Sequence, residues 1–299
     1  MRVRHIAAGL VASTLVFTAC GSSKTATTTS SSAAGSSSTA AAGGLTATGK
    51  IDNCDVYGTK GSIPFTPTSS GTLSLQTSLP APGWFNGDNA AGVKDGYEYC
   101  MGAEIAWLGG LDKVSLTNVD FDQLVAAGTK SFDLALAEIS ITDKRKQVVD
   151  FSTPYFASDI GVIVKKDTAV TSTADLKKLS IGVQQGTTGA DFATKNIAPN
   201  AKVFPDSASM FAALDAGSVQ AVMTDTSIVQ QQEKQSNGAE VVVGQYKTGE
   251  SYGALYPKGS ANEDAFNKAI QYMIDNKILS KLSVTYLSGD PTTVPFFTV

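Results

Sequence analysis

Hydrophobic and polar positions change their spacing several times between residues 72 and 137. Strand-like alternation begins at residues 72–75, and helical spacing follows at 97–108. The pattern next predicts a strand at 113–118, a helix at 121–127 and a strand at 133–137. Strands that alternate with helices are typical of parallel pairing. We therefore expect an α/β protein with mainly parallel sheets.

A helix, a glycine and a strand recur later in the chain in a similar order. Residues 124–128 lead to a strand at 132–136, and residues 211–217 lead to a strand at 219–223. Any α/β protein can contain this order, because glycine often ends a helix. Together with the alternation described above, the repeat suggests two comparable lobes.

Polar residues follow the last strand of each repeat. They are Glu138, Ser140 and Thr142 in the first repeat, and Thr224 and Asp225 in the second. Ligands of open α/β sheets bind beyond the carboxyl ends of the strands. We therefore expect a cleft where the two polar edges face each other.

The N-terminal segment, residues 1–20, has the pattern of a signal peptide. A basic start is followed by an apolar run at 6–17, which is too short to span a membrane as a permanent helix. The residues before Cys20 resemble a bacterial lipobox, in which the cysteine carries the lipid of the mature protein. Ordinary cleavage near Ala19 is the alternative.

Residues 21–50 consist almost wholly of Ser, Thr, Ala and Gly. Such a composition buries too little apolar surface to offset the entropy of ordering, so we expect a disordered tether. About thirty flexible residues have a typical reach of roughly 30 Å. This suits a domain held at a membrane surface by a lipid on Cys20.

Overall composition narrows the possible functions. The chain has 299 residues, a net charge of −4 and 17% charged residues without long basic runs, so nucleic acid is not an expected partner. Its one histidine, His5, lies in the signal segment and is absent from the mature protein. Catalytic triads, Cys–His pairs and histidine–zinc sites are thereby excluded. We expect no cofactor and no metal.

Cys54 and Cys100 remain as an even pair once Cys20 is lipidated. In an oxidising compartment such a pair favours a disulfide. Two separate buried thiols are the alternative.

Residues 137–155 contain a strand end, Ser-x-Thr-x-x-Arg and then Phe-Ser-x-Pro-Tyr. This segment resembles the type II periplasmic binding proteins for polar amino acids, family 3 of the solute-binding proteins of ABC transporters. Further matches are at 96–98, 182–188, 224–225 and 252–253. Together they extend from about residue 73 to about residue 287.

The resemblance implies two lobes joined by a hinge beside the ligand cleft. Lobe 1 would comprise residues 51–160 and 250–299, and lobe 2 residues 161–249. Crossovers are expected near 156–162 and 246–253. The helices near 262–287 would pack back on lobe 1. Closure of lobe 2 over ligand held on lobe 1 would follow from tighter binding by the closed form.

The resemblance also implies a set of ligand-binding residues. Arg145 would grip an α-carboxylate with its planar fork, and Asp225 would hold the α-ammonium. The other matching positions, which would add donors or aromatic stacking, are Ser140, Thr142, Thr187, Thr188 and Trp84. The alternatives are a surface arginine at Arg145, a helix cap at Asp225 and an ordinary core or exposed loop aromatic at Trp84.

Glu138 departs from the family pattern, which often has a small or neutral residue there. An added acid near Asp225 favours a cationic or amino-rich ligand. The alternative is a carboxylate that faces solvent or pairs with a lysine. No arginine lies in residues 77–88, so acidic amino acids are not favoured.

These features predict a monomeric lipoprotein on the extracytoplasmic face of the cell membrane. It would capture an amino acid and deliver it to an ABC permease, and it would not be an enzyme. One alternative is a dehydratase-like enzyme on the same fold, with Glu138 or Asp225 as a general acid. Another is a ligand-sensing lipoprotein without a transport role.

Overall fold

Two five-stranded sheets organise residues 45–299, which are the part of the chain described by the computed structural model. The predicted signal segment, Cys20 and most of the predicted tether lie outside these residues. The predicted tether extended to residue 50, but strand β1, Gly49–Ile51, already includes its last two residues. Gly49 packs directly against the Trp107 ring of helix α1, Tyr97–Leu108.

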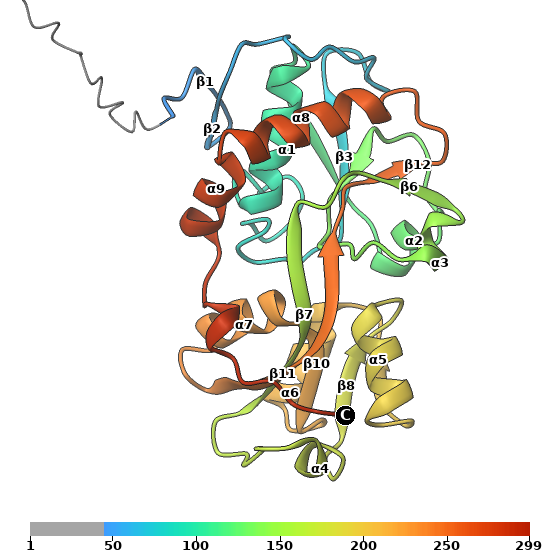
Figure 1. The fold of residues 1–299 in the computed structure, drawn as a ribbon, viewed down its shortest axis with the longest axis vertical. Helices are drawn as coiled ribbons and strands as arrows, with labels where there is room; N and C mark the ends of the chain where they lie inside the picture. The colour runs from blue at the N-terminus through green and yellow to red at the C-terminus, as the bar shows by residue number, and fades with distance from the viewer. Residues whose placement is uncertain (1–44) are drawn as a thin grey trace, which may run out of the picture. The chain divides into compact units, whose positions relative to one another are not determined.

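Lobe 1 is built on the sheet with strand order β4-β3-β5-β12-β6. Its strands are β3 Leu73–Thr77, β4 Val114–Asn118, β5 Leu134–Ala135, β6 Val149–Phe151 and β12 Leu255–Pro257. Its helices are α1 Tyr97–Leu108, α2 Phe121–Val125, α3 Asp143–Lys146, α8 Glu263–Asp275 and α9 Ile278–Tyr286. Figure 1 shows α8 and α9 beside α1, and all three helices contribute to one core.

Lobe 2 is built on the sheet with strand order β11-β7-β10-β8-β9. Its strands are β7 Phe156–Lys165, β8 Ile181–Gln184, β9 Lys202–Phe204, β10 Ala221–Asp225 and β11 Glu240–Tyr252. Its helices are α4 Thr173–Leu176, α5 Thr188–Asn196, α6 Ser207–Asp215 and α7 Thr226–Gln235. Along β10, Ala221 and Met223 pack in one apolar cluster and Val222 packs in another. The sheet is therefore buried on both faces, which agrees with the apolar sequences of its strands.

Strand pairing is more mixed than the helix–strand alternation suggested. Each large sheet has two parallel and two antiparallel pairings. The parallel pairs join strands that are connected through helices. The antiparallel pairs involve β6 and β12 in lobe 1, and β7 and β11 in lobe 2. Antiparallel neighbours need no helical crossover, so the alternation of helices and strands did not reveal them.

The lobes are joined by β7 and β11, which run side by side (Figure 1). Phe156 and Tyr252, at the lobe 1 end of this pair, pack in the lobe 1 core, whereas Ile160 and Tyr246 pack in the lobe 2 core. The register shifts between Tyr246 and Glu250. Extra residues on one strand bend a ladder, so this irregularity lies where the chain passes between lobes.

The end of the chain differs from the expected return to lobe 1. After α9 and the 3₁₀ turn Pro291–Thr293, the C-terminal tail lies along β11 in lobe 2. Gln245 N–H donates to the Pro295 carbonyl at 2.9 Å, and Phe297 N–H donates to the Gln245 carbonyl at 2.8 Å. The Phe297 ring packs against Gly244. Apolar contact and backbone pairing therefore hold residues 295–297 on lobe 2.

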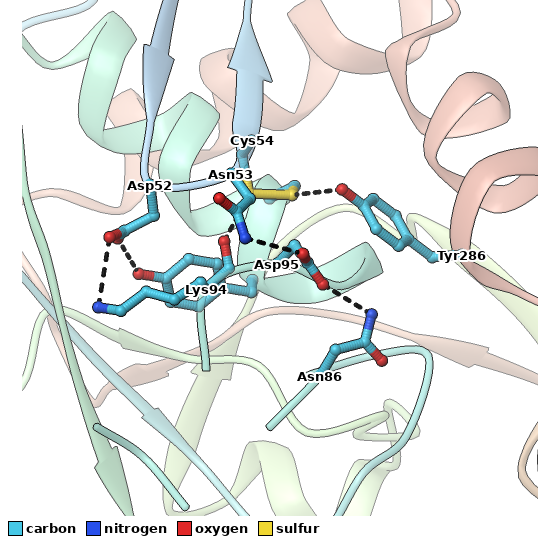
Figure 2. The surroundings of a disulfide bond; sticks show 9 residues. Asp52, Asn53, Cys54, Asn86, Lys94, Asp95 and Tyr286 are labelled. Atoms are coloured by element: carbon cyan, nitrogen blue, oxygen red, sulfur yellow. Dashed lines mark hydrogen bonds and ion pairs between the residues drawn. A yellow bond between two sulfur atoms is a disulfide. The ribbon is translucent and has the colours of Figure 1, made fainter. Parts of the chain in front are cut away.

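Cys54 and Cys100 are joined in a disulfide that links strand β2, Cys54–Val56, to helix α1 (Figure 2). Around it, Asp95 accepts hydrogen bonds from Asn53 at 3.2 Å and Asn86 at 2.8 Å. The small β1–β2 hairpin is a two-stranded sheet, which has little stability of its own. The disulfide attaches it to the helix at the centre of lobe 1.

Within residues 45–299, no helix combines the length and apolar character needed to cross a membrane. Residues 45–299 belong to one compact unit with cores in both lobes.

Candidate functional site

A cavity of about 300 Å³ lies between the two lobes. Lobe 1 contributes the loop at 78–84, the end of β5 and helix α3, while lobe 2 contributes residues after β8 and β10 and from α6 and α7. The lining residues are Ser78, Pro80, Ala81, Pro82, Trp84, Phe121, Ala137, Glu138, Ser140, Arg145, Gln184, Thr187, Thr188, Ser207, Ala208, Phe211, Ala212, Asp215, Thr224, Asp225, Ile228, Gln231, Gln232 and Gln235. The cavity is therefore the expected cleft at the carboxyl ends of strands.

Arg145 is buried at 6% exposure and lines this cavity. Its guanidinium donates to the Ser140 carbonyl at 2.6 Å and to the Gly186 carbonyl of lobe 2 at 2.9 Å. It also lies 5.3 Å from the centre of the Phe121 ring. This geometry differs from the surface arginine that the neighbouring charges would favour. Because Arg145 has donors beyond those two, it retains capacity to bind a carboxylate.

Asp225 ends β10 and is 5% exposed in the same cavity. It occupies the N-cap position of α7, yet its side chain makes no capping hydrogen bond. Burial, together with the nearby charge of Glu250, raises the pKa of Asp225 to about 7, although Tyr252 and Arg145 oppose this rise. A cation placed beside Asp225 would favour its ionised form.

Glu250 was not predicted from the sequence, although it connects both lobes. Its Oε2 accepts hydrogen bonds from Ser140 Oγ in lobe 1 and Thr188 Oγ1 in lobe 2, each at 2.6 Å. Both hydroxyls were expected to face a ligand. Glu250 lies 110 residues from Ser140 in sequence, so local pattern held no signal of the contact.

Two of the predicted threonines cap helices. Thr142 caps α3 by accepting from Arg145 N–H at 3.2 Å, and it does not line the cavity. Thr142 therefore holds the Arg145 backbone in the structure, and its expected contribution to ligand binding stays a prediction. Thr187 caps α5 by accepting from Ala190 N–H at 3.0 Å, and it also lines the cavity.

Trp84 lies in the cavity wall and is 1% exposed. Its ring makes edge contacts with Tyr97, Phe156 and Tyr252, so it belongs to both the core and the cleft. Gly96, at φ 125°, brings the start of α1 against the Trp84 backbone, where a Cβ would lie 2.3 Å from the Trp84 carbonyl oxygen. Only glycine permits this approach.

Glu138 follows β5 and lines the cavity beside the other acidic residues. Its backbone N–H donates to Glu98 Oε1 at 3.0 Å, and Glu98 also accepts from the Tyr155 hydroxyl. Glu98 is fully buried, and burial raises its pKa to about 8. Burial, Glu98 and Asp225 together raise the pKa of Glu138 well above its usual range. Glu138 is half-buried, with its Oε1 buried, and it forms no ion pair with a lysine within residues 45–299.

The sequence also did not point to several apolar and amide residues of the wall. Phe121 supports Arg145, while Phe211 and Ile228 line the lobe 2 side together with Gln231. The helix predicted at 121–127 includes Phe121, but the pattern gave no sign that this ring faces the cleft. Residues 45–299 hold no cluster of three or more His, Cys, Asp or Glu residues suited to a metal ion.

The two lobes, the mixed sheets and the interlobe cavity define a solute-binding protein of the periplasmic type II fold. The chain belongs to the bacterial extracellular solute-binding proteins, family 3, whose family model matches residues 80–289. Members of this family are solute-binding proteins of transport systems rather than enzymes.

Relatives with known ligands cover most of the described chain. The L-cystine-binding protein TcyJ of Escherichia coli K12 is 29% identical over 231 residues, which are 74% of this chain and 85% of that protein. An ancestral arginine-binding protein bound to arginine superimposes with a TM-score of 0.64 at 30% identity, covering 72% of this chain and 98% of that one. The same kind of protein bound to glutamine gives 0.65 at 31% identity, covering 73% and 98%.

Proposed function

We propose that this protein captures an amino acid outside the cytoplasm and delivers it to an ABC uptake permease. The α-carboxylate would bind Arg145 and the donors near Thr188, and the α-ammonium would bind Asp225. The single observation that carries this proposal is the placement of a buried arginine and a buried aspartate in one cavity between two lobes.

The two charges suit the two ends of an amino acid. A guanidinium binds a carboxylate through charge-assisted hydrogen bonds, and such bonds gain strength in a poorly hydrated cleft. Arg145 belongs to lobe 1 and Asp225 to lobe 2, so a ligand that engages both would favour closure. The cystine, arginine and glutamine bound by the relatives all carry an α-carboxylate and an α-ammonium.

The membrane anchor is a separate part of the proposal. It depends on the lipobox-like residues before Cys20 and on the Ser, Thr, Ala and Gly-rich segment after it. Under this proposal the binding unit acts as a monomer at the outer face of the cell membrane, where a permease receives the ligand.

Calorimetric titration of residues 44–299 with single amino acids tests the binding step. The fragment is first unfolded and refolded to remove carried ligand. We expect one-to-one binding that Arg145→Ala reduces by at least about 100-fold, because a charge-assisted pair is removed. Arg145→Lys keeps the charge but loses the planar fork, so an intermediate loss is expected. Lys144→Ala, an exposed neighbour on the same helix, is the matched control and should leave affinity unchanged.

Equal affinities of the Arg145 and Lys144 variants would contradict the carboxylate assignment. Uptake of labelled amino acid by cells that lack the protein tests the transport step. We expect these cells to lose uptake. Supplying the unaltered protein should restore uptake, whereas supplying Arg145→Ala should not. Unchanged uptake with intact binding would favour a ligand-sensing lipoprotein instead.

A further inference from the structure

Glu138 holds an unusual polar atom at the cavity wall. Its Oε1 is buried and has no hydrogen-bond partner among residues 45–299. Leaving a buried polar atom without a partner is costly, so such atoms in native proteins call for an explanation. The backbone of Glu138 also has φ 47°, a left-handed conformation that is uncommon for a residue other than glycine. The chain therefore keeps a carboxylate at a strained position where a glycine would fit more easily.

None of the neighbours of Glu138 is placed to form a hydrogen bond with its Oε1. Glu98 faces it from α1, but its oxygens accept from the Glu138 N–H and the Tyr155 hydroxyl. Asp225 faces it from β10 and carries the same charge as ionised Glu138. The Arg145 guanidinium donates to the Ser140 and Gly186 carbonyls. A cation that satisfies Glu138 would have to come from outside these residues.

The charge of the whole cavity points in the same direction. Its charged lining residues are three acids, Glu138, Asp215 and Asp225, and one base, Arg145. No lysine in the described chain lines it. An amino acid with a neutral side chain brings equal positive and negative charge and would leave this excess of acids unchanged. A cationic side chain would reduce it.

We propose that Glu138 sets the specificity of the cleft by binding a cationic group, an amine or a guanidinium, on the side chain of the captured amino acid. This rests on the proposed function, because it assumes that Arg145 and Asp225 hold the ends of the same ligand. The unpartnered Oε1 would accept a hydrogen bond from the cation, and Glu98 would hold the Glu138 backbone in place.

The same geometry links binding of a cation to proton release. Glu98, Asp225 and Tyr155 are the titratable groups that interact with Glu138, and Arg145 lines the same cavity. Burial beside Glu98 and Asp225 favours the protonated form of Glu138. A bound cation favours the ionised form, so its arrival would displace one proton. Affinity for a cationic amino acid should therefore rise with pH by up to about tenfold per unit while Glu138 titrates.

Matched ligands separate Glu138 from the rest of the site. L-Arginine and L-citrulline differ mainly in charge, as do L-lysine and L-norleucine. We expect the unaltered fragment to prefer the cationic member of at least one pair. Glu138→Gln should weaken binding of that member by about 10- to 100-fold and leave the neutral member within about twofold. Asp225 titrates with both members of a pair. The additional rise in affinity with pH that the cationic member shows should therefore disappear in Glu138→Gln.

Asp215→Asn is the matched control, because it removes an exposed acid from the same cavity wall. Asp215→Asn should preserve the preference for the cationic ligand. If it weakens that preference as much as Glu138→Gln does, the effect comes from the combined charge of the cavity acids. Thermal unfolding checks each variant, and Glu138→Gly, which relieves the φ of 47°, is the second variant if Glu138→Gln does not fold.

Three results would overturn the inference. Equal weakening of both members by Glu138→Gln would place Glu138 on the α-ammonium. If the protein binds other amino acids but neither arginine nor lysine, the cationic side chain is rejected and the proposed function stands. If no amino acid binds the unaltered protein, the proposed function fails as well.

Discussion

At the scale of single residues, burial decides which of several similar side chains serves the cleft. Lys144, Arg145 and Lys146 are consecutive basic residues, but only Arg145 is buried. Successive helical residues point about 100° apart, so one turn presents only one of the three to the cavity. Composition alone suggested a surface arginine. The Ser-x-Thr-x-x-Arg spacing pointed to Arg145 instead, and Thr142 caps the turn that carries it.

Asp225 provides a second prediction at this scale. Asp225→Asn should lower amino acid affinity by about 10- to 100-fold, because a neutral amide cannot balance an α-ammonium. Affinity of the unaltered protein should rise with pH as Asp225, with its pKa of about 7, ionises, and the variant should lose this rise. Titration calorimetry of L-citrulline at several pH values measures both effects.

The free energy of unfolding should fall with rising pH, whereas ligand affinity should rise. A buried carboxyl with a raised pKa binds more protons folded than unfolded, so its contribution to stability falls as pH rises from about 4 towards 7. Ligand-free Asp225→Asn should therefore melt at a higher temperature than the unaltered fragment above pH 7. If Asp225→Asn binds ligand more weakly but does not melt at a higher temperature, ionised Asp225 does not destabilise the ligand-free fold.

At the scale of elements, local sequence predicted helices better than strand ends. The predicted helix at 97–108 has the bounds of α1, whereas the predicted strand at 133–137 is reduced to β5. Asp133 accepts from Thr68 N–H and Ser74 N–H, and Glu138 has a positive φ, so both ends leave strand geometry. These causes are tertiary or conformational, and the alternation of apolar residues carries no sign of them.

Strand β11 supplies the prediction at this scale, since its Glu250 joins hydroxyls from both lobes. Glu250→Gln should lower ligand affinity several-fold, because an amide accepts more weakly from Ser140 and Thr188 and the closed arrangement loses stability. Calorimetry measures the affinity, and small-angle scattering with and without amino acid measures closure. Thr188→Ala should cost less in the Glu250→Gln background than alone. Strictly additive losses would indicate that the carboxylate does not couple the lobes.

At the scale of the whole molecule, the two lobes have separate cores and are connected through β7, β11 and the C-terminal segment. The helix–glycine–strand repeat predicted the lobes, and the resemblance predicted the two crossing strands. The third connection was not predicted, because residues 287–299 have no helical or strand periodicity. Gln245, buried in β11, donates to the Pro291 and Val294 carbonyls and thereby satisfies an otherwise irregular segment.

The disulfide provides a prediction for the stability of this whole unit. Replacing both Cys54 and Cys100 by Ser should lower the free energy of unfolding by about 2–4 kcal/mol, because the bond closes a loop between residues 46 apart in sequence. Urea unfolding of the 44–299 fragment, which contains no other cysteine, measures the change. Ligand affinity should be retained, since neither cysteine lines the cavity. Equal stability of the two proteins would mean that noncovalent contacts alone hold the β1–β2 hairpin.

The C-terminal tail also determines where the two ends of the described chain lie. Strand β1 packs on lobe 1 beside Trp107, whereas Phe297 packs on lobe 2. Figure 1 shows β1 beside lobe 1 and the C-terminus at lobe 2. A rotation of one lobe against the other therefore changes the distance between the ends. Donor and acceptor fluorophores fused to the two ends of residues 45–299 would convert lobe closure into an optical signal, so this part of the chain has the layout of a ligand sensor.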